Sequence, residues 1–316
     1  MAAALALAER GLGRTGTNPS VGCIIVNNGF IVGRGWTQSG GRPHAEAMAL
    51  AQAGKAAKDA TVYVTLEPCA HESSRGPACT DVLIRAHPKA VVSAVEDPDT
   101  RTLGQGHLRL RDAGIDVLSG VMASQALRVL AGFRSRVERG RPYVTLKLAT
   151  SLDGAIALAD GTSRWITGDA SRAHAHLERS RCDAILVGAG TVKADAPMLT
   201  VRLPGLSQWN PRRIMLGGGE APDGWETIAL PNDIANLCCN SILVEGGAMT
   251  AASFLKAGLV DRLMLYRAPI LIGGGKPSIA DFGVTDLESA HGQWGLVDSR
   301  RLGNDRLEVY EKTETE

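Results

Sequence analysis

Three residues with zinc-binding side chains accompany one carboxylate in the first third of the chain. His44 is followed two positions later by Glu46, while Cys69 and Cys79 come further along. One imidazole nitrogen and two thiolates can hold Zn²⁺ and leave its fourth tetrahedral position to water. Water on such a zinc ionises near neutral pH, and a nearby carboxylate can carry its proton to a leaving group. The set predicts a zinc hydrolase that removes an amine from a nucleobase-like ring, with Glu46 as the catalytic residue.

The segments around these residues predict how they are positioned. The alanine-rich run 45–53 predicts a helix that starts after Pro43, with His44 and Glu46 in its first turn. The positive end of a helix dipole favours a carboxylate and a hydroxide on the metal. Residues 61–66 are rich in β-formers, so we expect Cys69 to follow a strand, with Pro68 fixing the turn.

Two other interpretations of the same residues stay open at this point. In one, the cysteines are simply buried and the His-x-Glu pair is solvated. In the other, zinc only stabilises a non-catalytic scaffold, but a structural zinc needs a fourth protein ligand and no carboxylate base. The nine residues between Cys69 and Cys79, where the general deaminase pattern has two, indicate a particular branch of the deaminases.

Composition narrows the class of protein. The chain has 316 residues, 44% hydrophobic and 21% charged, which suits two soluble globular domains. The net charge of +1 and the absence of a basic block argue against a nucleic-acid partner. The six cysteines do not form a dense disulfide framework, so we expect a cytoplasmic protein. The apolar N-terminus lacks a basic start and is interrupted by Glu9 and Arg10, which predicts a packed helix rather than a signal peptide or membrane span.

Hydrophobic patterning predicts two α/β domains that meet near residue 140. A hairpin is expected at 21–26 and 30–36, joined by Asn27-Asn28-Gly29. After helix 45–53 and strand 61–66, the alternation continues as helix 80–86, strand 90–94, helix 106–113, strand 115–118 and helix 123–138. The boundary falls at Arg139-Gly140-Arg141-Pro142, which gives domains 1–139 and 140–316.

The second half starts a new sheet with a strand at 143–148. Strand 184–187 ends at Gly188-Ala189-Gly190-Thr191, and strand 241–244 ends at Glu245-Gly246-Gly247 before a helix at about 250–257. A glycine turn between a strand and a helix N-terminus suits a phosphate or dinucleotide, because free backbone N–H groups and the dipole face the anion. Such turns also serve merely to reverse the chain tightly, and both interpretations stay open.

Longer motifs give the chain a family resemblance over nearly its whole length. The first half carries Asn18-Pro19-x-Val21-Gly22, Pro43-His44-Ala45-Glu46, Thr65-Leu66-Glu67-Pro68-Cys69-x-His71 and Gly76-Pro77-x-Cys79. The second carries Lys147-Leu148-Ala149-x-Ser151-Leu152-Asp153-Gly154, Ser163-Arg164-Trp165-Ile166-Thr167-Gly168, Thr191-Val192-x-x-Asp195-x-Pro197-x-Leu199-Thr200-Val201-Arg202 and Leu243-Val244-Glu245-Gly246-Gly247. With these motifs the chain resembles the bifunctional deaminase/reductase of riboflavin biosynthesis.

The resemblance implies a fold, two reactions and a set of cofactors. The first domain would be a cytidine-deaminase-like three-layer α/β domain, and the second a dihydrofolate-reductase-like α/β domain. The first would remove a ring amine from a diaminopyrimidinone ribosyl phosphate with zinc. The second would use NADPH to reduce the ribosyl group to a ribityl chain. The resemblance also implies a homo-oligomer, a small-molecule substrate, and neither a nucleic-acid nor a membrane partner.

The resemblance also assigns residues to each site. In the first domain His44, Cys69 and Cys79 would bind zinc, Glu46 would shuttle the proton, and Asn18 and His71 would line the pocket. In the second, NADPH would contact Ala149, Trp165, Thr191, Asp195, Gly247, Ala248, Met249, Thr250, Ala251, Ala252 and Ser253. The substrate would contact Ser163, Arg179, Leu199, Arg202 and Glu245, and Lys147 would be a catalytic proton donor. Arg179 and Arg202 offer planar donor forks for a phosphate, although an arginine is ordinarily a surface ion-pair partner.

One stretch departs from the family pattern. Only the 24 residues 217–240 separate Leu216 from Ser241, where the family has a substantially longer segment. The start of this stretch, 217–226, has little periodicity and predicts a loop. Since the region helps to build the cofactor side of the pocket, the alternative is a monofunctional deaminase with a degenerate, shortened reductase domain.

Overall fold

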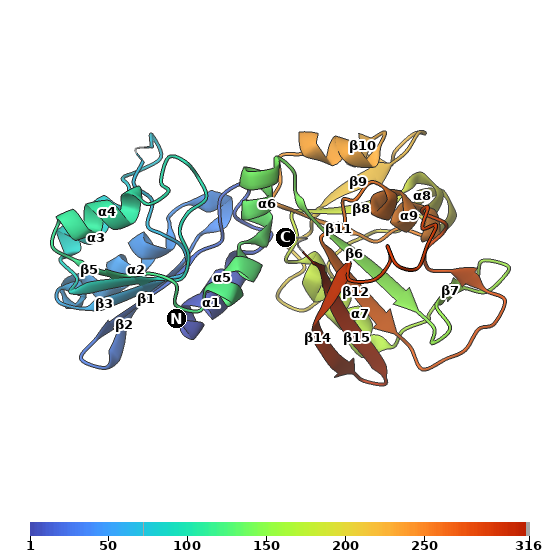
Figure 1. Ribbon diagram of the computed structural model, residues 1–316, viewed down its shortest axis with the longest axis horizontal. Helices are drawn as coiled ribbons and strands as arrows, with labels where there is room; N and C mark the ends of the chain where they lie inside the picture. The colour runs from blue at the N-terminus through green and yellow to red at the C-terminus, as the bar shows by residue number, and fades with distance from the viewer. Residues whose placement is uncertain (72, 314–316) are drawn as a thin grey trace. The chain divides into compact units, whose positions relative to one another are not determined.

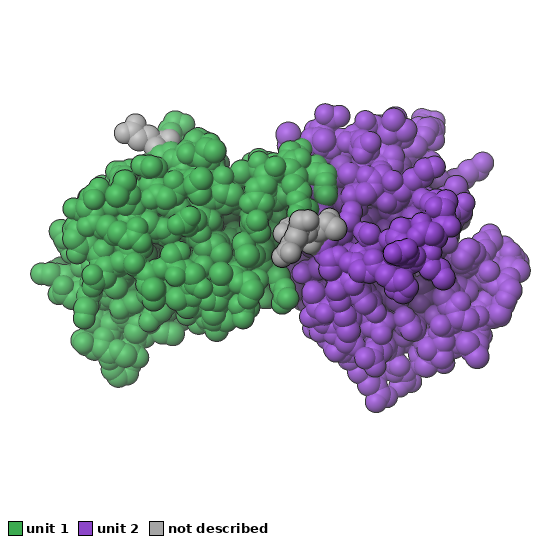
Figure 2. Space-filling view, viewed as in Figure 1, with its two compact units in different colours: residues 1–141 green, residues 142–316 purple. Residues whose placement is uncertain are grey.

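The chain folds as two compact units, residues 1–141 and 142–316 (Figure 2). The computed structural model describes residues 1–71 and 73–313. Each unit is an α/β domain with its own sheet and its own buried core (Figure 1).

The described part of the first unit contains one five-stranded sheet, in the order β2-β1-β3-β4-β5. Its strands are β1 (Gly22–Asn27), β2 (Phe30–Trp36), β3 (Thr61–Val64), β4 (Ala90–Ser93) and β5 (Asp116–Leu118). Strand β1 is antiparallel to both β2 and β3, whereas β3, β4 and β5 run parallel. Parallel neighbours require crossover helices, which the predicted alternation of strands and helices supplies.

Helices cover both faces of this sheet. They are α1 (Ala2–Ala8), α2 (Ala45–Ala53), α3 (Cys79–Ala86), α4 (Gln105–Asp112), α5 (Ala123–Val129) and α6 (Ala131–Arg139). A Cβ on Gly22 would lie 1.9 Å from the Ala4 carbonyl oxygen, so this glycine allows α1 to pack directly on β1. The next residue, Cys23, joins the buried cluster with Ala45 of α2. Successive strand residues point to opposite faces, so α1 and α2 cover opposite sides and the unit has three layers.

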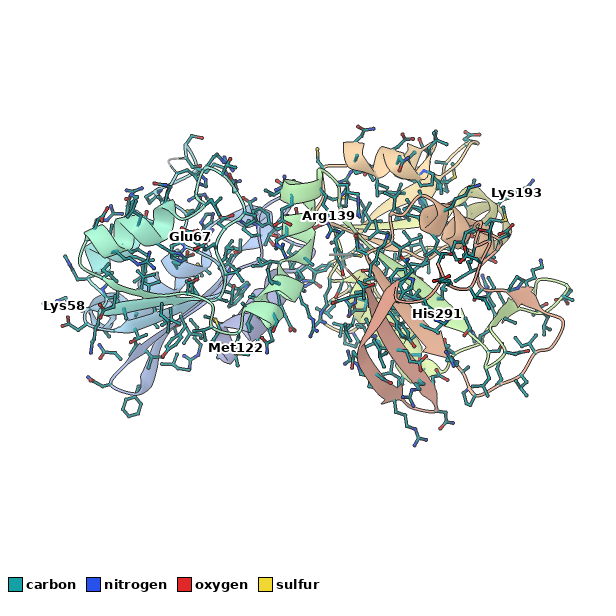
Figure 3. The ribbon with its side chains drawn as sticks, in the orientation of Figure 1. Lys58, Glu67, Met122, Arg139, Lys193 and His291 are labelled. Atoms are coloured by element: carbon teal, nitrogen blue, oxygen red, sulfur yellow. The ribbon has the colours of Figure 1, made fainter. Side chains whose placement is uncertain are left out.

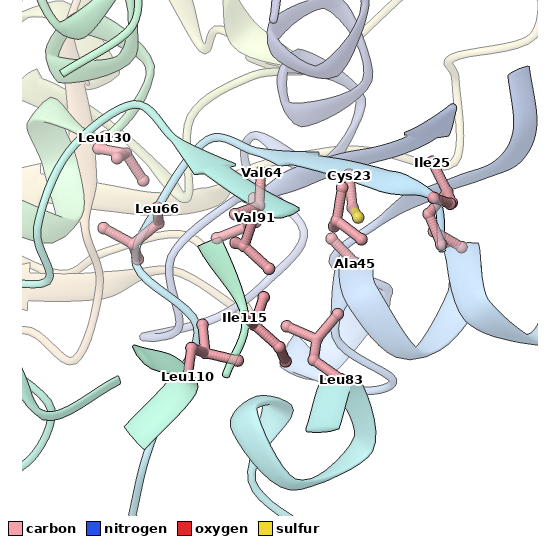
Figure 4. Close-up of a cluster of buried hydrophobic side chains, with 14 of the residues drawn as sticks. Cys23, Ile25, Ala45, Val64, Leu66, Leu83, Val91, Leu110, Ile115 and Leu130 are labelled. Atoms are coloured by element: carbon pink, nitrogen blue, oxygen red, sulfur yellow. The ribbon is translucent and has the colours of Figure 1, made fainter. Parts of the chain in front are cut away.

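The main core of the first unit lies on the α2 side of the sheet (Figure 4). Apolar side chains from β1, β3 and β4 meet Ala45, Leu83 and Leu110, which come from α2, α3 and α4. Each of these three side chains is fully buried. The core therefore anchors the N-terminal ends of α2 and α3, where the predicted zinc ligands lie.

The second unit contains an eight-stranded sheet in the described residues, in the order β10-β9-β8-β11-β6-β12-β15-β14. These strands are β6 (Tyr143–Thr150), β8 (Ala184–Gly188), β9 (Arg212–Leu216), β10 (Glu226–Ile228), β11 (Ser241–Val244), β12 (Arg262–Arg267), β14 (Trp294–Leu302) and β15 (Asp305–Lys312). Pairing is parallel from β10 to β12 and antiparallel through β15 and β14. A short antiparallel pair joins β7 (Ala155–Ala157) to β13 (Lys276–Pro277).

The helices of the second unit are α7 (Asp169–Arg179), α8 (Ala189–Asp195) and α9 (Ala248–Lys256). Helices α8 and α9 begin where the adjacent strands β8 and β11 end, so their N-termini lie at the same edge of the sheet. This edge is where open parallel sheets bind ligands. In the described residues no helix is both long and apolar enough to cross a lipid bilayer.

The structure confirms the α/β class of both halves and corrects one expected helix. The helix predicted over 123–138 is two helices, because α5 ends at Val129 and α6 begins at Ala131. The loop predicted over 217–226 is present as far as Trp225, and β10 and a 3₁₀ helix, η4 (Pro231–Asn236), follow it. Although short, the stretch 217–240 therefore adds a strand to the sheet, and Ile228 and Ile234 enter the core of the unit.

Candidate active sites

The three predicted zinc ligands meet in the first unit. One ligand atom each from His44, Cys69 and Cys79 lies within 4.8 Å of the other two. The His44 Nδ1 atom is 3.2 Å from the Cys79 Sγ atom and 3.6 Å from the Cys69 Sγ atom. Bond lengths of about 2.3 Å to sulfur and 2.0–2.1 Å to nitrogen imply a nitrogen–sulfur separation of about 3.6 Å around a tetrahedral zinc. The donor set and its spacing fit zinc.

Two helix N-termini position these ligands. His44 was predicted in the first turn of α2 but is its N-cap residue, one position before the helix begins, and Cys79 is the first residue of α3. Cys69 lies in the preceding loop, where its sulfur accepts a hydrogen bond from the Cys79 backbone N–H at 3.3 Å. A hydrogen bond from the Cys79 side chain lowers the pKa of Cys69 to about 4, while the same contact raises the pKa of Cys79, so the pair favours a thiolate on Cys69 that can bind a metal ion.

Glu46 lies in the first turn of α2 and is only 3% exposed. Burial raises the pKa of its carboxyl above the usual range. A carboxyl with a raised pKa is suited to accept and release a proton near neutral pH. The structure therefore puts a buried carboxyl beside the zinc cluster.

A cavity of about 280 Å³ opens onto this cluster. Its wall includes five of the predicted residues, Asn18, His44, Glu46, Cys69 and His71; the sixth, Cys79, is 2% exposed and is not in the wall. Residues without a site prediction also line it, and half of them are charged: Arg42, Glu67, Arg75, Asp97, Asp99, Arg101 and Arg136. Sequence reasoning gave no role to the two aspartates, although the Asp97-Pro98-Asp99 turn after a strand was visible.

The two aspartates differ in their electrostatic surroundings. Burial raises the pKa of Asp97 to about 7. Asp99 instead receives hydrogen bonds from Arg101, at 2.9 Å from the Nε atom to Oδ1, and these lower its pKa. This part of the cavity wall thus combines a carboxyl that can donate a hydrogen bond near neutral pH with an ion pair.

The second unit has a buried ion-pair network formed by Lys147 of β6, Arg179 at the end of α7 and Glu245, which directly follows β11. Arg179 donates to both oxygens of Glu245, at 2.7 Å and 2.9 Å, and Lys147 Nζ lies 3.7 Å from the same carboxylate. The side chains of Arg179 and Glu245 are 14% and 8% exposed. Burial alone would raise the pKa of Glu245, but Lys147 and Arg179 hold it at about 2. Glu245 is therefore ionised at neutral pH.

A cavity of about 470 Å³ lies next to this network. Its wall contains eight predicted residues: Lys147, Ala149, Ser163, Trp165, Arg179, Asp195, Leu199 and Arg202. Glu245 does not line the cavity but contacts two residues that do, Lys147 and Arg179. Thr191 and the segment 247–253 are also outside the wall; a Cβ on Gly247 would lie 3.9 Å from Thr191 Oγ1.

The turn before α9 has the shape expected of a phosphate-binding turn. Gly247 is the N-cap residue of α9, so Ala248 and the residues after it present backbone N–H groups at the helix start. A Cβ on Gly246 would lie 2.4 Å from the Thr250 Cβ atom, and one on Gly188 would lie 2.4 Å from Thr250 Oγ1. These glycines let two strand ends approach the helix N-terminus closely, which fits the diphosphate of a dinucleotide.

Several residues of the second cavity were not predicted as site residues. They include Ile156, Arg164, Ile166, Arg172, His176 and Tyr266. Burial lowers the pKa of His176, and Arg179 and Arg202 lower it further, so its imidazole is neutral at physiological pH. Arg164 lies between Ser163 and Trp165, in the motif from which those two residues were predicted, so the motif could have indicated Arg164 as well. Tyr266 comes from β12, distant in sequence, and no local pattern pointed to it.

Comparison with known proteins identifies the family. Residues 1–95 match the cytidine and deoxycytidylate deaminase zinc-binding region, and residues 142–221 with 232–307 match the RibD C-terminal domain. The riboflavin biosynthesis protein RibD of Escherichia coli is 39% identical, with 96% of each chain covered. That of Mycobacterium tuberculosis is 40% identical, covering 93% of this chain and 91% of the relative. The chain belongs to the RibD family.

Solved structures extend the match to the whole fold. Acinetobacter baumannii RibD superimposes with a TM-score of 0.88 at 35% identity, covering 98% of this chain and 97% of that chain. A diaminohydroxyphosphoribosylaminopyrimidine deaminase/5-amino-6-(5-phosphoribosylamino)uracil reductase from Thermotoga maritima gives 0.88 at 32% identity, with the same coverage. The RibD family assignment confirms the cytidine-deaminase-like domain followed by a reductase domain.

The family assignment also decides between the two functions left open by the short segment 217–240. The RibD C-terminal match covers both sides of it, leaving out only 222–231. The alternative of a monofunctional deaminase with a degenerate reductase domain is therefore wrong. The chain is an enzyme of riboflavin biosynthesis with deaminase and reductase activities, acting on a small molecule with zinc and NADPH as cofactors.

Proposed function

We propose that the first unit deaminates a diaminopyrimidinone ribosyl phosphate and that the second reduces the ribosyl group of the product to a ribityl chain. The observation that carries the proposal is the His44, Cys69 and Cys79 cluster beside the buried carboxylate of Glu46. The Thermotoga maritima relative, whose name describes both reactions, supports these substrates.

In the first unit, His44, Cys69 and Cys79 would hold zinc, which lowers the pKa of a water molecule so that it can attack at neutral pH. Glu46 would accept a proton as the water oxygen bonds to the ring carbon. It would then pass this proton to the exocyclic nitrogen as the carbon–nitrogen bond breaks and ammonia leaves. Asn18 and His71, which line the cavity, would orient the ring.

In the second unit, the turn at Gly246 and Gly247 and the start of α9 would hold NADPH, which supplies a hydride to the ribosyl carbon. Ala149, Trp165, Thr191, Asp195 and residues 247–253 would surround the cofactor, as the family motifs imply. Arg179 and Arg202 would bind the phosphate, with Ser163, Leu199 and Glu245 around the rest of the substrate. Lys147 would protonate the sugar oxygen released when the ring opens, and Glu245 at 3.7 Å would keep its ammonium in place.

We propose further that the enzyme is a cytoplasmic homo-oligomer. All six cysteines are free thiols, which agrees with a reducing compartment. Large apolar side chains at the surface of the second unit, among them Leu271 and Leu287 at 76% and 79% exposed, could be covered by a second copy. Sedimentation of the zinc-loaded protein tests the oligomeric state, since a single 33.2 kDa species would contradict it.

The Glu46→Gln variant tests the deaminase proposal. It keeps the size of the side chain and leaves all three zinc ligands in place. We expect zinc content to stay the same while ammonia release falls by about 10²–10⁴-fold, the usual range for a lost general acid–base. NADPH oxidation with the deaminated intermediate should be unchanged, which serves as the internal control. Ammonia release close to the wild-type rate would contradict the role of Glu46.

A further inference from the structure

Glu67 is a buried carboxylate in the first unit to which the zinc chemistry assigns no role. It lies two positions before Cys69, is 2% exposed, and sits inside the unit near α4 (Figure 3). A buried carboxylate must be compensated by hydrogen bonds or by an opposite charge. What compensates Glu67 indicates what it does.

Three backbone N–H groups from one distant segment donate to this carboxylate. The Oε2 atom accepts from Asp97 at 3.1 Å and from Gly104 at 3.0 Å, and the Oε1 atom accepts from His107 at 3.0 Å. His107 lies in the first turn of α4, whose N-cap Gly104 offers no side-chain hydrogen bond. Glu67 therefore caps α4 and closes the base of the loop 97–104 at the same time.

The loop 97–104 forms part of the wall of the cavity that the zinc cluster also lines. Asp97, Asp99 and Arg101 line the cavity. Thr102, which is fully buried, lies with its Oγ1 atom 3.1 Å from His71 Nδ1, another cavity residue. The positions of Asp97, Asp99, Arg101 and Thr102 therefore depend on the conformation of this loop.

The segment around Glu67 leaves little room for the loop to move. The Glu67 backbone N–H donates to the Val95 carbonyl oxygen at 2.9 Å, which joins it to the residues that precede the loop. A Cβ on Gly106 would lie 2.1 Å from the Pro68 carbonyl oxygen and 3.0 Å from Glu67 Cγ. Helix α4 thus packs directly on the Glu67-Pro68 backbone, which continues into the zinc ligand Cys69.

We propose that Glu67 is a positioning residue that sets the distance between the zinc cluster and the substrate-binding wall formed by the loop 97–104. The proposal rests on the proposed function, namely that this cavity binds the pyrimidine substrate. Although Glu67 lines the cavity, its role is to act through the loop, because both of its oxygens accept backbone N–H groups of Asp97, Gly104 and His107. Its loss weakens substrate binding more than it slows the chemical step.

The Glu67→Gln variant is the test. The amide has one accepting oxygen, so its NH₂ group must face at least one backbone N–H, and one of the three hydrogen bonds is replaced by a donor–donor contact. In the zinc-loaded full-length enzyme we expect KM for ammonia release to rise about tenfold or more, with kcat within about threefold of wild type. Zinc content and NADPH oxidation with the deaminated intermediate should not change.

A matched control is Asp183→Asn in the second unit. Asp183 Oδ2 also accepts backbone N–H groups, from Asn240 at 2.9 Å and Ser241 at 3.0 Å, and it lines neither cavity. It should leave KM for ammonia release unchanged. A merely structural role of Glu67 would lower the amount of active enzyme, and hence kcat, at constant KM. That result, or a KM within about twofold of wild type, would overturn the proposal.

Two further measurements apply if Glu67→Gln does not fold. Thr102→Val removes the hydroxyl that contacts His71 and should also raise KM with zinc retained; an unchanged KM would overturn the proposal. In the wild-type enzyme, the amides of Asp97, Gly104 and His107 should resist hydrogen exchange. Exchange as fast as that of exposed loop amides would equally contradict it. If the proposed function is wrong, the wild-type enzyme releases no ammonia. If only the Glu67 proposal is wrong, the wild-type enzyme releases ammonia and the variants keep its KM.

Discussion

The ion pair between Arg179 and Glu245 allows a quantitative prediction. Replacing Arg179 by Met removes two hydrogen bonds to a carboxylate that is 8% exposed, and leaves Lys147 at 3.7 Å as its nearest cation. Removing one partner of a buried pair costs about 3–5 kcal/mol. Because Lys147 remains, we expect the lower end, a loss of about 3 kcal/mol in the free energy of unfolding of the second unit.

Tryptophan fluorescence during urea unfolding measures this loss. Four of the five tryptophans, Trp165, Trp209, Trp225 and Trp294, belong to residues 142–316, so the signal reports mainly on the second unit. The double variant Arg179→Met/Glu245→Gln should recover part of the loss, because no unpaired carboxylate stays buried. The pair Arg212 and Glu226 is 40% and 43% exposed, so Glu226→Gln should cost less than about 1 kcal/mol. If Arg179→Met lowers the free energy of unfolding by no more than Glu226→Gln does, the reasoning is refuted.

Three further predictions follow from the same two sites. Gly246→Ala would bring a Cβ to 2.4 Å from Thr250 Cβ, so KM for NADPH should rise at least about tenfold. Gly295→Ala, where a Cβ meets no close neighbour, is the control. Equal KM values for the two variants would contradict the proposed cofactor-binding turn. Chelation of zinc should abolish ammonia release but leave NADPH oxidation with the deaminated intermediate intact; loss of both activities would contradict two separate sites. The pKa of Glu245 is lowered from 4.5 to about 2, so its contribution to stability is present above about pH 4.5 and is lost as pH falls toward 2. Unfolding of the wild type across that range should steepen relative to Glu245→Gln, and identical profiles would contradict the shift.

Sequence patterns predicted well the elements whose residues carry strong local signals. Helix α2 spans Ala45–Ala53 as expected, because an alanine-rich run lies between Pro43 and Gly54, and Gly54 adopts a positive φ of 53° at the helix end. Strand β11 spans Ser241–Val244 as expected, because an apolar run ends at the Glu245-Gly246-Gly247 turn. The zinc ligands came together as predicted because His44 and Cys79 lie at the starts of α2 and α3, and Cys69 lies in the loop between β3 and α3.

The patterns missed features that depend on contacts between distant residues. The apolar spacing of 123–138 continues through Leu130, so nothing local marks the break between α5 and α6. Asp97 and Asp99, which line the first cavity, lie on the loop 97–104, and Glu67 accepts a hydrogen bond from the Asp97 backbone N–H although it lies 30 positions earlier in the chain. Periodicity carries no information about such hydrogen bonds, and a side chain such as Tyr266 enters the second cavity only through strand pairing.

The most direct test of the whole account is one coupled assay. Purified, zinc-loaded enzyme would be given the diaminopyrimidinone ribosyl phosphate and NADPH, and ammonia release and NADPH oxidation would be recorded in the same sample. The account predicts both signals, with NADPH oxidation lagging behind ammonia release and absent from the Glu46→Gln variant until the deaminated intermediate is added. Ammonia release without NADPH oxidation would contradict the reductase assignment, and the absence of both signals would contradict the substrate.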